Sequence, residues 1–146
     1  MRILILGANS EIGQAVARKF AKEEHADVYL ASRDVDILQK RATDITTRYQ
    51  IEASALYLDA TNYPTHKQFY TGLNPKPDGV FLVFGYLGNQ RLAEQDFQEA
   101  AKIIETNYLG AVSLLEIIAK DFETRGHGFV LGISSEIGRA SCRERV

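Results

Sequence analysis

A short apolar run near the N-terminus leads directly into a turn bounded by two glycines, and this stretch constrains the fold more than any other. Residues 3–6 are all Ile or Leu, as in a strand buried on both faces of a parallel sheet. Gly7 and Gly13 bound the turn, and apolar residues then recur at helical spacing over residues 15–21. The stretch therefore predicts a strand, a tight turn and a helix.

This turn is a candidate phosphate-binding site. The first N–H groups of a helix have no partner within the helix, so a phosphate can accept hydrogen bonds from them. Gly7 would permit the sharp turn, and Gly13 would let the helix approach the sheet or the phosphates closely. The spacing matches neither the G-x-G-x-x-G fingerprint nor the phosphate-binding loop that ends in lysine. An ordinary α/β turn therefore remains the alternative at this point.

Length, composition and charge exclude several other classes. The 146 residues and 45% hydrophobic content suit one domain with a substantial core. No apolar run approaches the roughly 20 residues of a membrane span, and the apolar N-terminal run is too short for a signal peptide, so we expect a cytoplasmic protein. The net charge of −2, without a clustered basic stripe, argues against nucleic acid or an anionic membrane as a partner. His25, His66, His127 and Cys142 have no metal-ligand spacing.

Strand and helix patterns alternate along the rest of the chain. Strands are predicted over residues 26–31, 53–58, 80–85 and 129–133, and helices over residues 35–49, 63–73 and 90–122, with a break near Asp96. This alternation predicts an α/β fold, a doubly wound parallel sheet with helices on both faces.

Short motifs follow the predicted strands, where ligands bind in sheets of this kind. They are Gly7-Ala8-Asn9-Ser10-Glu11-Ile12-Gly13, Asp59, Val83-Phe84-Gly85, Asn107 within a helix, and Ile133-Ser134-Ser135. In this order, over residues 1–135, they resemble the short-chain dehydrogenase/reductase family. The resemblance implies a Rossmann-type sheet with strand order 3-2-1-4-5, truncated after the fifth strand, which would then be an exposed edge that favours aggregation. Glu11 stands where that family usually has the middle glycine of Gly-x-x-x-Gly-x-Gly, and Gly85 alone is retained from its Asn-Asn-Ala-Gly. Segments 85–90 and 106–115 are similar to the subgroup containing the keto-reductase half of the decaprenylphosphoryl-ribose 2′-epimerase.

The resemblance implies a nicotinamide dinucleotide cofactor. The residues that it assigns to cofactor binding are Gly7, Ala8, Asn9, Ser10, Glu11, Ile12, Gly13, Ser32, Arg33, Asp59, Ala60 and Gly85. Ser32 occupies the usual acidic position and Arg33 follows it, and because a guanidinium suits a 2′-phosphate, we expect NADP(H) rather than NAD. The alternative is that Arg33 is merely solvated, and the neighbouring Asp34 weakens the expectation.

Three of these assignments have competing interpretations. A carboxylate at Glu11 would repel a pyrophosphate, so we expect it to point outward while the backbone amides of residues 9–12 bind the phosphates. Asp59 would contact adenine by the resemblance, but it could instead be the N-cap of the following helix. Asn107 would help to hold a water that relays protons, or it could hydrogen-bond a neighbouring turn.

The resemblance also implies hydride transfer with a small-molecule carbonyl or alcohol substrate. Ser135 is similar to the family's catalytic serine, with Ser134 as the less favoured candidate, and Asn107 completes the catalytic residues that the chain retains. The family's Tyr-x-x-x-Lys is missing, because no tyrosine follows Tyr108 and no lysine follows Lys120. We therefore expect a marginal fold that binds dinucleotide weakly and does not turn over.

Residues 136–146 resemble the translation of a sequencing-library adapter. We therefore divide the chain into the N-terminal part of a dinucleotide-binding domain, residues 1–135, and a non-native tail, residues 136–146. In this interpretation Cys142 is not a nucleophile. The alternative is a genuine basic tail.

Two other functions are compatible with the fold. An extended-type nucleotide-sugar epimerase or dehydratase would usually have glycine at the position of Ser10. A dinucleotide-binding regulator without hydride transfer would not need Asn107 or Ser135. The apolar residues 114–122 suit either a well-buried helix or, as in the family, a contact within a homo-oligomer.

Overall fold

The structure is a computed structural model that describes residues 1–134. Its strands are β1 (Arg2–Leu6), β2 (Asp27–Ser32), β3 (Ala53–Tyr57), β4 (Gly79–Leu82) and β5 (Phe129–Gly132). Its helices are α1 (Glu11–Glu23), α2 (Val35–Tyr49), α3 (Tyr63–Thr71), α4 (Gln90–Ala93), α5 (Phe97–Ile104), the π-helical turn η1 (Glu105–Leu109) and α6 (Gly110–Arg125).

All five strands form one parallel sheet in the order β3-β2-β1-β4-β5. Ile3 of β1 pairs with Val28 of β2 on one side and with Gly79 of β4 on the other. The order reverses direction between β1 and β4, so the carboxyl ends of these strands flank the crevice where α/β sheets bind ligands. The predicted Rossmann-type sheet and strand order are confirmed.

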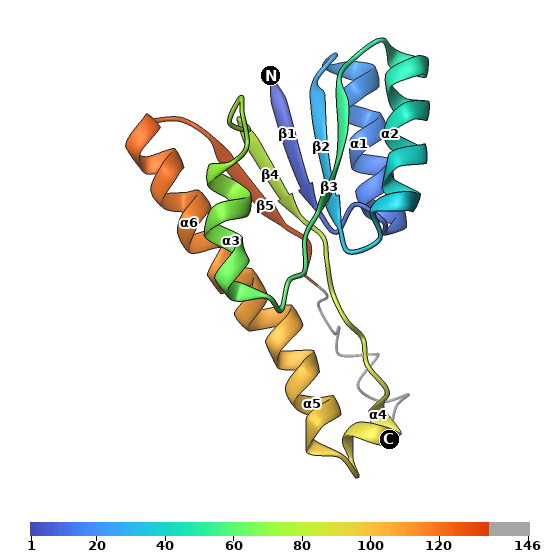
Figure 1. Ribbon diagram of the computed structural model, residues 1–146, viewed down its shortest axis with the longest axis vertical. Coiled ribbons are helices and arrows are strands. Elements are labelled where there is room, and N and C mark those ends of the chain that lie inside the picture. The colour runs from blue at the N-terminus through green and yellow to red at the C-terminus, as the bar shows by residue number, and fades with distance from the viewer. Residues whose placement is uncertain (135–146) are drawn as a thin grey trace, which may run out of the picture.

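Helices cover both faces of the sheet (Figure 1), with α1 and α2 on one side and α3 and α6 on the other. Successive side chains of β1 point to opposite faces, so Ile3 and Ile5 join the core beneath α1 and α2, while Leu4 and Leu6 join the core beneath α3 and α6. All four are completely buried, and each contributes about 1.5–3 kcal/mol of hydrophobic stabilisation. The apolar run therefore forms the centre of the molecule.

The long helical segment is interrupted twice. The break expected near Asp96 is present, since α4 ends at Ala93 and the Asp96 carboxylate caps α5 by accepting the Gln98 N–H at 2.9 Å. The second interruption, η1 between α5 and α6, has no counterpart in the sequence prediction. In Figure 1, α4 and α5 extend beyond the sheet, while α6 packs beside α3.

Two strand predictions need comment. β4 ends at Leu82 rather than at residue 85, because its partner β1 stops at Leu6 and leaves no strand for residues 83–85 to pair with. β5 is the edge strand of the sheet among residues 1–134, and all its residues are exposed, as the sequence predicted. Within the described residues, no helix combines the length and apolarity that crossing a bilayer demands.

Candidate functional site

A pocket lies beyond the carboxyl ends of β1, β2, β3 and β4. The residues that line it are Gly7, Ser10, Ala31, Ser32, Arg33, Leu58, Asp59, Ala60, Thr61, Val83, Phe84, Gly85, Tyr86, Lys102 and Thr106. Seven of the residues predicted to bind a cofactor are among them: Gly7, Ser10, Ser32, Arg33, Asp59, Ala60 and Gly85. These seven come from four separate strand ends, so the fold brings together residues that are up to 78 positions apart (85 minus 7).

There is no room for a side chain at Gly7, in the turn after β1, or at Gly13, in the first turn of α1. Gly7 has a φ of +95°, and a Cβ atom there would lie 2.6 Å from the Cα atom of Phe84. A Cβ atom on Gly13 would lie 2.9 Å from both the Ala8 Cα atom and the Gly7 carbonyl oxygen. Glycine is therefore required at both positions, and the backbone is left accessible to a ligand at Gly7.

The start of α1 carries N–H groups that can bind an anion. Ser10 caps the helix, because its Oγ atom accepts the Gly13 N–H at 3.0 Å and its carbonyl accepts the Gln14 N–H at 3.0 Å. Within residues 1–134, the N–H groups of Asn9, Glu11 and Ile12 have no hydrogen-bond acceptor. Unpaired donors at a helix N-terminus are well suited to a phosphate.

Glu11 lies away from this pocket. Its exposed side chain borders a different groove, on the surface between α1 and α2, together with Arg18 and Lys40. This is the outward direction expected of a carboxylate beside a phosphate site. The α1 dipole favours the acidic side chain in its first turn without placing it among the ligand-binding groups.

Ala8 and Asn9 do not line the pocket, and their hydrogen bonds hold the turn in place. The Ala8 carbonyl accepts a hydrogen bond from Gln14 Nε2 at 2.5 Å, and the Asn9 carbonyl accepts one from Arg41 Nη1 at 2.9 Å. The side-chain amide of Asn9 donates to Ser32 Oγ at 3.0 Å. Asn9 therefore ties the glycine turn to the end of β2. Ile12 and Gly13 also lie outside the pocket lining.

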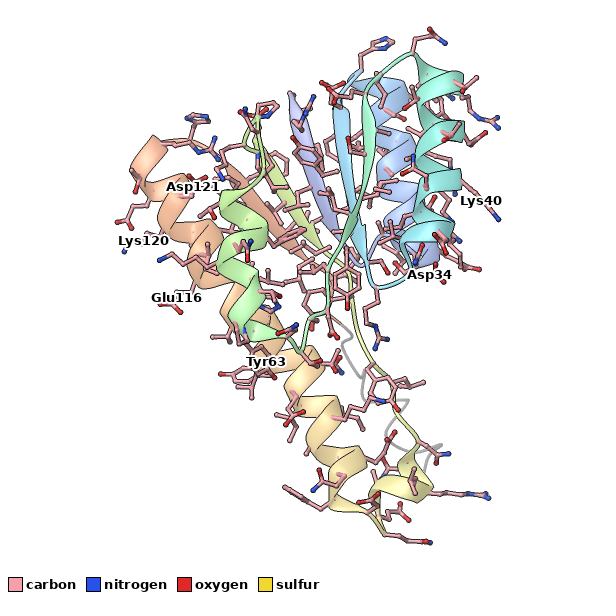
Figure 2. The ribbon with its side chains drawn as sticks, viewed as in Figure 1. Asp34, Lys40, Tyr63, Glu116, Lys120 and Asp121 are labelled. Atoms are coloured by element: carbon pink, nitrogen blue, oxygen red, sulfur yellow. The ribbon has the colours of Figure 1, made fainter. Side chains whose placement is uncertain are left out.

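Arg33 and Asp34 have different surroundings although they are adjacent. Arg33 is exposed and lines the pocket. The Asp34 carboxylate instead caps α2 by accepting the Ile37 N–H at 3.1 Å. Figure 2 shows Asp34 at the N-terminal end of α2 and Tyr63 at that of α3, both at the carboxyl end of the sheet. The Asp34 carboxylate is thus hydrogen-bonded to the N-terminus of α2.

Asp59 forms a turn of its own and is not a helix cap. Its Oδ1 atom accepts the Thr61 N–H at 2.9 Å and the Thr61 hydroxyl at 2.8 Å. These hydrogen bonds, with the backbone one foremost, hold the pKa of the Asp59 carboxyl below its usual value, and the positive charge of Arg33 acts in the same direction. The N-cap of α3 is Asn62, so the alternative interpretation of Asp59 as that cap is wrong.

Asn107 holds the backbone of Tyr86. Its Oδ1 atom accepts the Tyr86 N–H at 2.7 Å, and its Nδ2 atom donates to the Tyr86 carbonyl at 2.9 Å. The competing interpretation, a structural hydrogen bond to a neighbouring segment, therefore agrees with the structure, with the loop after β4 as the partner. Asn107 lies in η1 outside the pocket lining, so it shapes the pocket through Tyr86.

The loop that contains Tyr86 is fixed at further points. Glu99 of α5 is 9% exposed, and its Oε1 atom accepts hydrogen bonds from the Tyr86 hydroxyl at 2.7 Å and the Asn89 N–H at 2.9 Å. The Tyr86 hydrogen bond is the main reason that the pKa of Glu99 lies below its usual value. The Lys102 ammonium lies 4.5 Å from the centre of the Tyr86 ring. α5 therefore positions this side of the pocket.

Several lining residues were not anticipated. Thr61 follows the predicted Asp59 and Ala60 directly, and an Asp-x-Thr turn was a recognisable signal for it. Lys102 and Thr106 are four residues apart on the α5–η1 segment, so helical spacing would have placed them on one face. Tyr86 had no local signal, because its position depends on Asn107 and Glu99. Ser135 and the tail 136–146 lie outside the described residues.

Comparisons with known proteins show which family the chain is similar to. The chain matches the family model for short chain dehydrogenases over residues 1–145. It is 33% identical over 139 residues to an uncharacterized oxidoreductase of Mycobacterium tuberculosis, covering 93% of the chain and 55% of the relative. An NADP-dependent 3-hydroxy acid dehydrogenase of Schizosaccharomyces pombe is 24% identical over 143 residues, with 95% and 55% covered. The chain therefore spans about half the length of these curated relatives.

Solved structures share the fold. Levodione reductase superposes with a TM-score of 0.84 at 24% identity, with 92% of this chain and 54% of that one covered. A short-chain dehydrogenase from Sphingobium yanoikuyae, solved in complex with NADPH, gives a TM-score of 0.82 at 23% identity, with 92% and 53% covered.

Proposed function

Because the chain belongs to the short chain dehydrogenase family, we propose that it is the cofactor-binding part of an NADP(H)-dependent oxidoreductase that interconverts a small carbonyl compound and an alcohol. The observation that carries this proposal is the meeting of Gly7, Arg33, Asp59 and Gly85 in one pocket at the carboxyl edge of the sheet. An ordinary α/β turn would not require the missing side chain at Gly7, the unpaired N–H groups at the start of α1 or an arginine in the pocket lining.

The glycine turn fits a dinucleotide's pyrophosphate. The unpaired N–H groups of Asn9, Glu11 and Ile12 lie close in the chain to Gly7 and Ser10, which line the pocket, and would supply donors there, while the helix dipole adds positive potential at the start of α1. No side chain can stand at Gly7, so the backbone itself would contact the phosphates. Ser10 and Gly13 contribute by fixing the first turn of α1.

Arg33 supports NADP(H) as the preferred cofactor. Its exposed guanidinium lines the pocket beside Ser32, and a guanidinium binds a dianionic 2′-phosphate more strongly than a hydroxyl. Asp34 does not oppose this preference, because its carboxylate is bound to the N-terminus of α2. Asp59 and Ala60, which also line the pocket, would contact the adenine.

The chemistry would divide between the cofactor and residues of the complete protein. A bound nicotinamide would supply or accept the hydride. Ser135 would hydrogen-bond the substrate oxygen, and Asn107 holds the loop through which Tyr86 lines the pocket. The sequence has no tyrosine after Tyr108 and no lysine after Lys120 to act as the acid/base pair. We therefore propose that this chain binds dinucleotide without turning it over.

The complete protein is proposed to be a homo-oligomer. Tyr108, Leu109 and Val112, at the junction of η1 and α6, are 65%, 43% and 47% exposed, although all three side chains are largely apolar. The opposite side of α6 buries Leu114 and Ile118 against the sheet. A helix that is apolar on both sides is suited to a contact between subunits.

Cofactor titration tests the proposal. NADPH and NADH fluorescence would be followed on adding this chain, and we expect tighter binding of NADPH. Arg33→Ala should weaken NADPH binding about tenfold, since a charge-assisted hydrogen bond contributes about 1.5–3 kcal/mol, and should leave NADH binding nearly unchanged. Arg18→Ala, an exposed arginine of α1 outside the pocket, is the matched control. An unchanged preference in Arg33→Ala contradicts the NADP(H) assignment, and failure to bind either dinucleotide contradicts the function.

A further inference from the structure

A completely buried histidine is hydrogen-bonded to the backbone of Asp59. His66 of α3 is 0% exposed, with Nε2 at 2.9 Å from the Asp59 carbonyl oxygen and Nδ1 at 2.9 Å from Ser113 Oγ on α6. A carbonyl oxygen can only accept a hydrogen bond, so Nε2 carries the proton and donates it. In the neutral ring Nδ1 then accepts the Ser113 hydroxyl. The Asp59 carbonyl therefore sets the tautomer, and the hydrogen bond to Ser113 fixes the orientation in which the ring holds Asp59.

The remaining hydrogen bonds leave one oxygen of Asp59 available. The carbonyl also accepts the Asn62 N–H at 3.1 Å, and Oδ1 is occupied by the N–H and hydroxyl of Thr61. Oδ2 has no hydrogen-bond donor within the described residues, and Asp59 lines the pocket. A carboxylate with a fixed backbone and one fixed oxygen presents the other oxygen in one direction.

α6 supports the same turn at a second point. A Cβ atom on Gly110 would lie 2.5 Å from the Ala60 carbonyl oxygen, so the helix backbone is in close contact with residue 60. Ser113 follows Gly110 by about one helical turn and reaches His66 from the same helix. The Tyr63 ring packs edge-on against the imidazole with centroids 5.9 Å apart. His66 thus links α3, α6 and the end of β3.

We infer that His66, oriented by Ser113, is a positioning residue that aims the Asp59 carboxylate at the exocyclic amino group of a purine base. This inference rests on the proposed function. A carboxylate accepts a hydrogen bond from the 6-amino group of adenine, whereas the 6-oxo group of hypoxanthine has no hydrogen to donate. The pocket should therefore distinguish the two bases, and His66 should determine how well it does so.

The experiment compares NADPH with its deamino analogue, which has hypoxanthine in place of adenine. Dissociation constants for both would be measured by nicotinamide fluorescence, at a temperature where each variant is folded. We expect this chain to prefer NADPH about tenfold, which corresponds to one charge-assisted hydrogen bond. His66→Leu should reduce the ratio to nearly one, mainly by weakening NADPH. His66→Gln, whose side-chain amide can still donate to a carbonyl, should retain part of the preference.

The controls separate positioning from general destabilisation. His127→Leu replaces an exposed histidine outside the pocket and should keep the full ratio. If His66→Leu weakens both analogues equally, His66 is merely structural and the inference is wrong. If His66→Leu does not fold, Ser113→Ala provides the test, because losing the hydroxyl removes the contact that orients the imidazole ring and should lower the ratio; an unchanged ratio overturns the inference. If the unsubstituted chain binds both analogues equally, the inference fails and the proposed function stands, whereas binding of neither contradicts the function itself.

Discussion

At the residue scale, Gly7 and Gly126 both have positive φ angles but for different reasons. Gly7 has φ +95° and lies against the backbone of Phe84, so both conformation and space exclude a side chain. Gly126 has φ +72° as the left-handed cap of α6, and an added Cβ atom would meet nothing within 4 Å. The two positions therefore separate the effect of backbone strain from the effect of steric contact.

We expect Gly7→Ala to be much more costly than Gly126→Ala. Left-handed strain alone should lower the free energy of unfolding by about 1 kcal/mol at Gly126. At Gly7 the contact with Phe84 adds to strain, and the loss should be about 3 kcal/mol, with NADPH binding abolished. Urea denaturation followed by circular dichroism measures both. Equal losses in the free energy of unfolding for the two variants would show that the backbone of Phe84 does not pack tightly against Gly7.

At the element scale, η1 allows one side chain to cross between two segments. The π-helical turn places Asn107 where both amide groups bond the backbone of Tyr86. Turns of this kind are rare within helices and occur often at functional sites. α6 therefore covers the sheet, while α5 and η1 support the loop after β4.

Asn107→Leu should release that loop. Losing two hydrogen bonds to the Tyr86 backbone should reduce the free energy of unfolding by about 2 kcal/mol and speed hydrogen exchange of the Tyr86 amide. Urea denaturation and exchange monitored by NMR measure the two effects. Asn62→Ala is the control, since Asn62 is exposed and its side chain does not cap α3. Unchanged protection of the Tyr86 amide in Asn107→Leu would contradict the role assigned to Asn107.

At the scale of the whole molecule, apolar side chains are exposed at the edge of the sheet that β5 forms among the described residues. Val130 of β5 pairs in register with Val80 of β4, yet Val130 is 41% exposed and Val80 is completely buried. Phe129 and Leu131 are exposed to a similar extent. An apolar edge strand with unpaired backbone groups favours association with other chains.

Val130→Lys should therefore reduce self-association without unfolding the chain. A charged side chain on an exposed edge strand opposes edge-to-edge pairing at little cost to the folded state. Sedimentation velocity at several protein concentrations, combined with urea denaturation, measures the two effects. Val80→Lys is the contrasting variant, because an unpaired ammonium in the core should prevent folding. If Val130→Lys associates as strongly as the unsubstituted chain, association does not involve β5.

The sequence by itself determined the sheet and the place of the site. Apolar periodicity is local, so it predicted α2 with the bounds 35–49 that the structure has, and the handedness of βαβ crossovers then limited the strand order. The same order places the residues that follow each strand at one edge of the sheet. Strand order placed Gly7, Arg33, Asp59 and Gly85 at that edge, and the family resemblance assigned them to one cofactor site.

Only the tertiary structure decided how those residues are held. Asn107 reaches Tyr86, His66 reaches Asp59, and the Asp59 carboxylate bonds Thr61 instead of capping α3. Such pairs depend on where two elements pack against each other, and no periodicity within either element specifies which side chain will meet which backbone group. The local pattern of apolar residues specifies each helix or strand and the face that it buries. The direction of a polar side chain is instead set by the hydrogen-bonding group that the packing of another element brings within its reach.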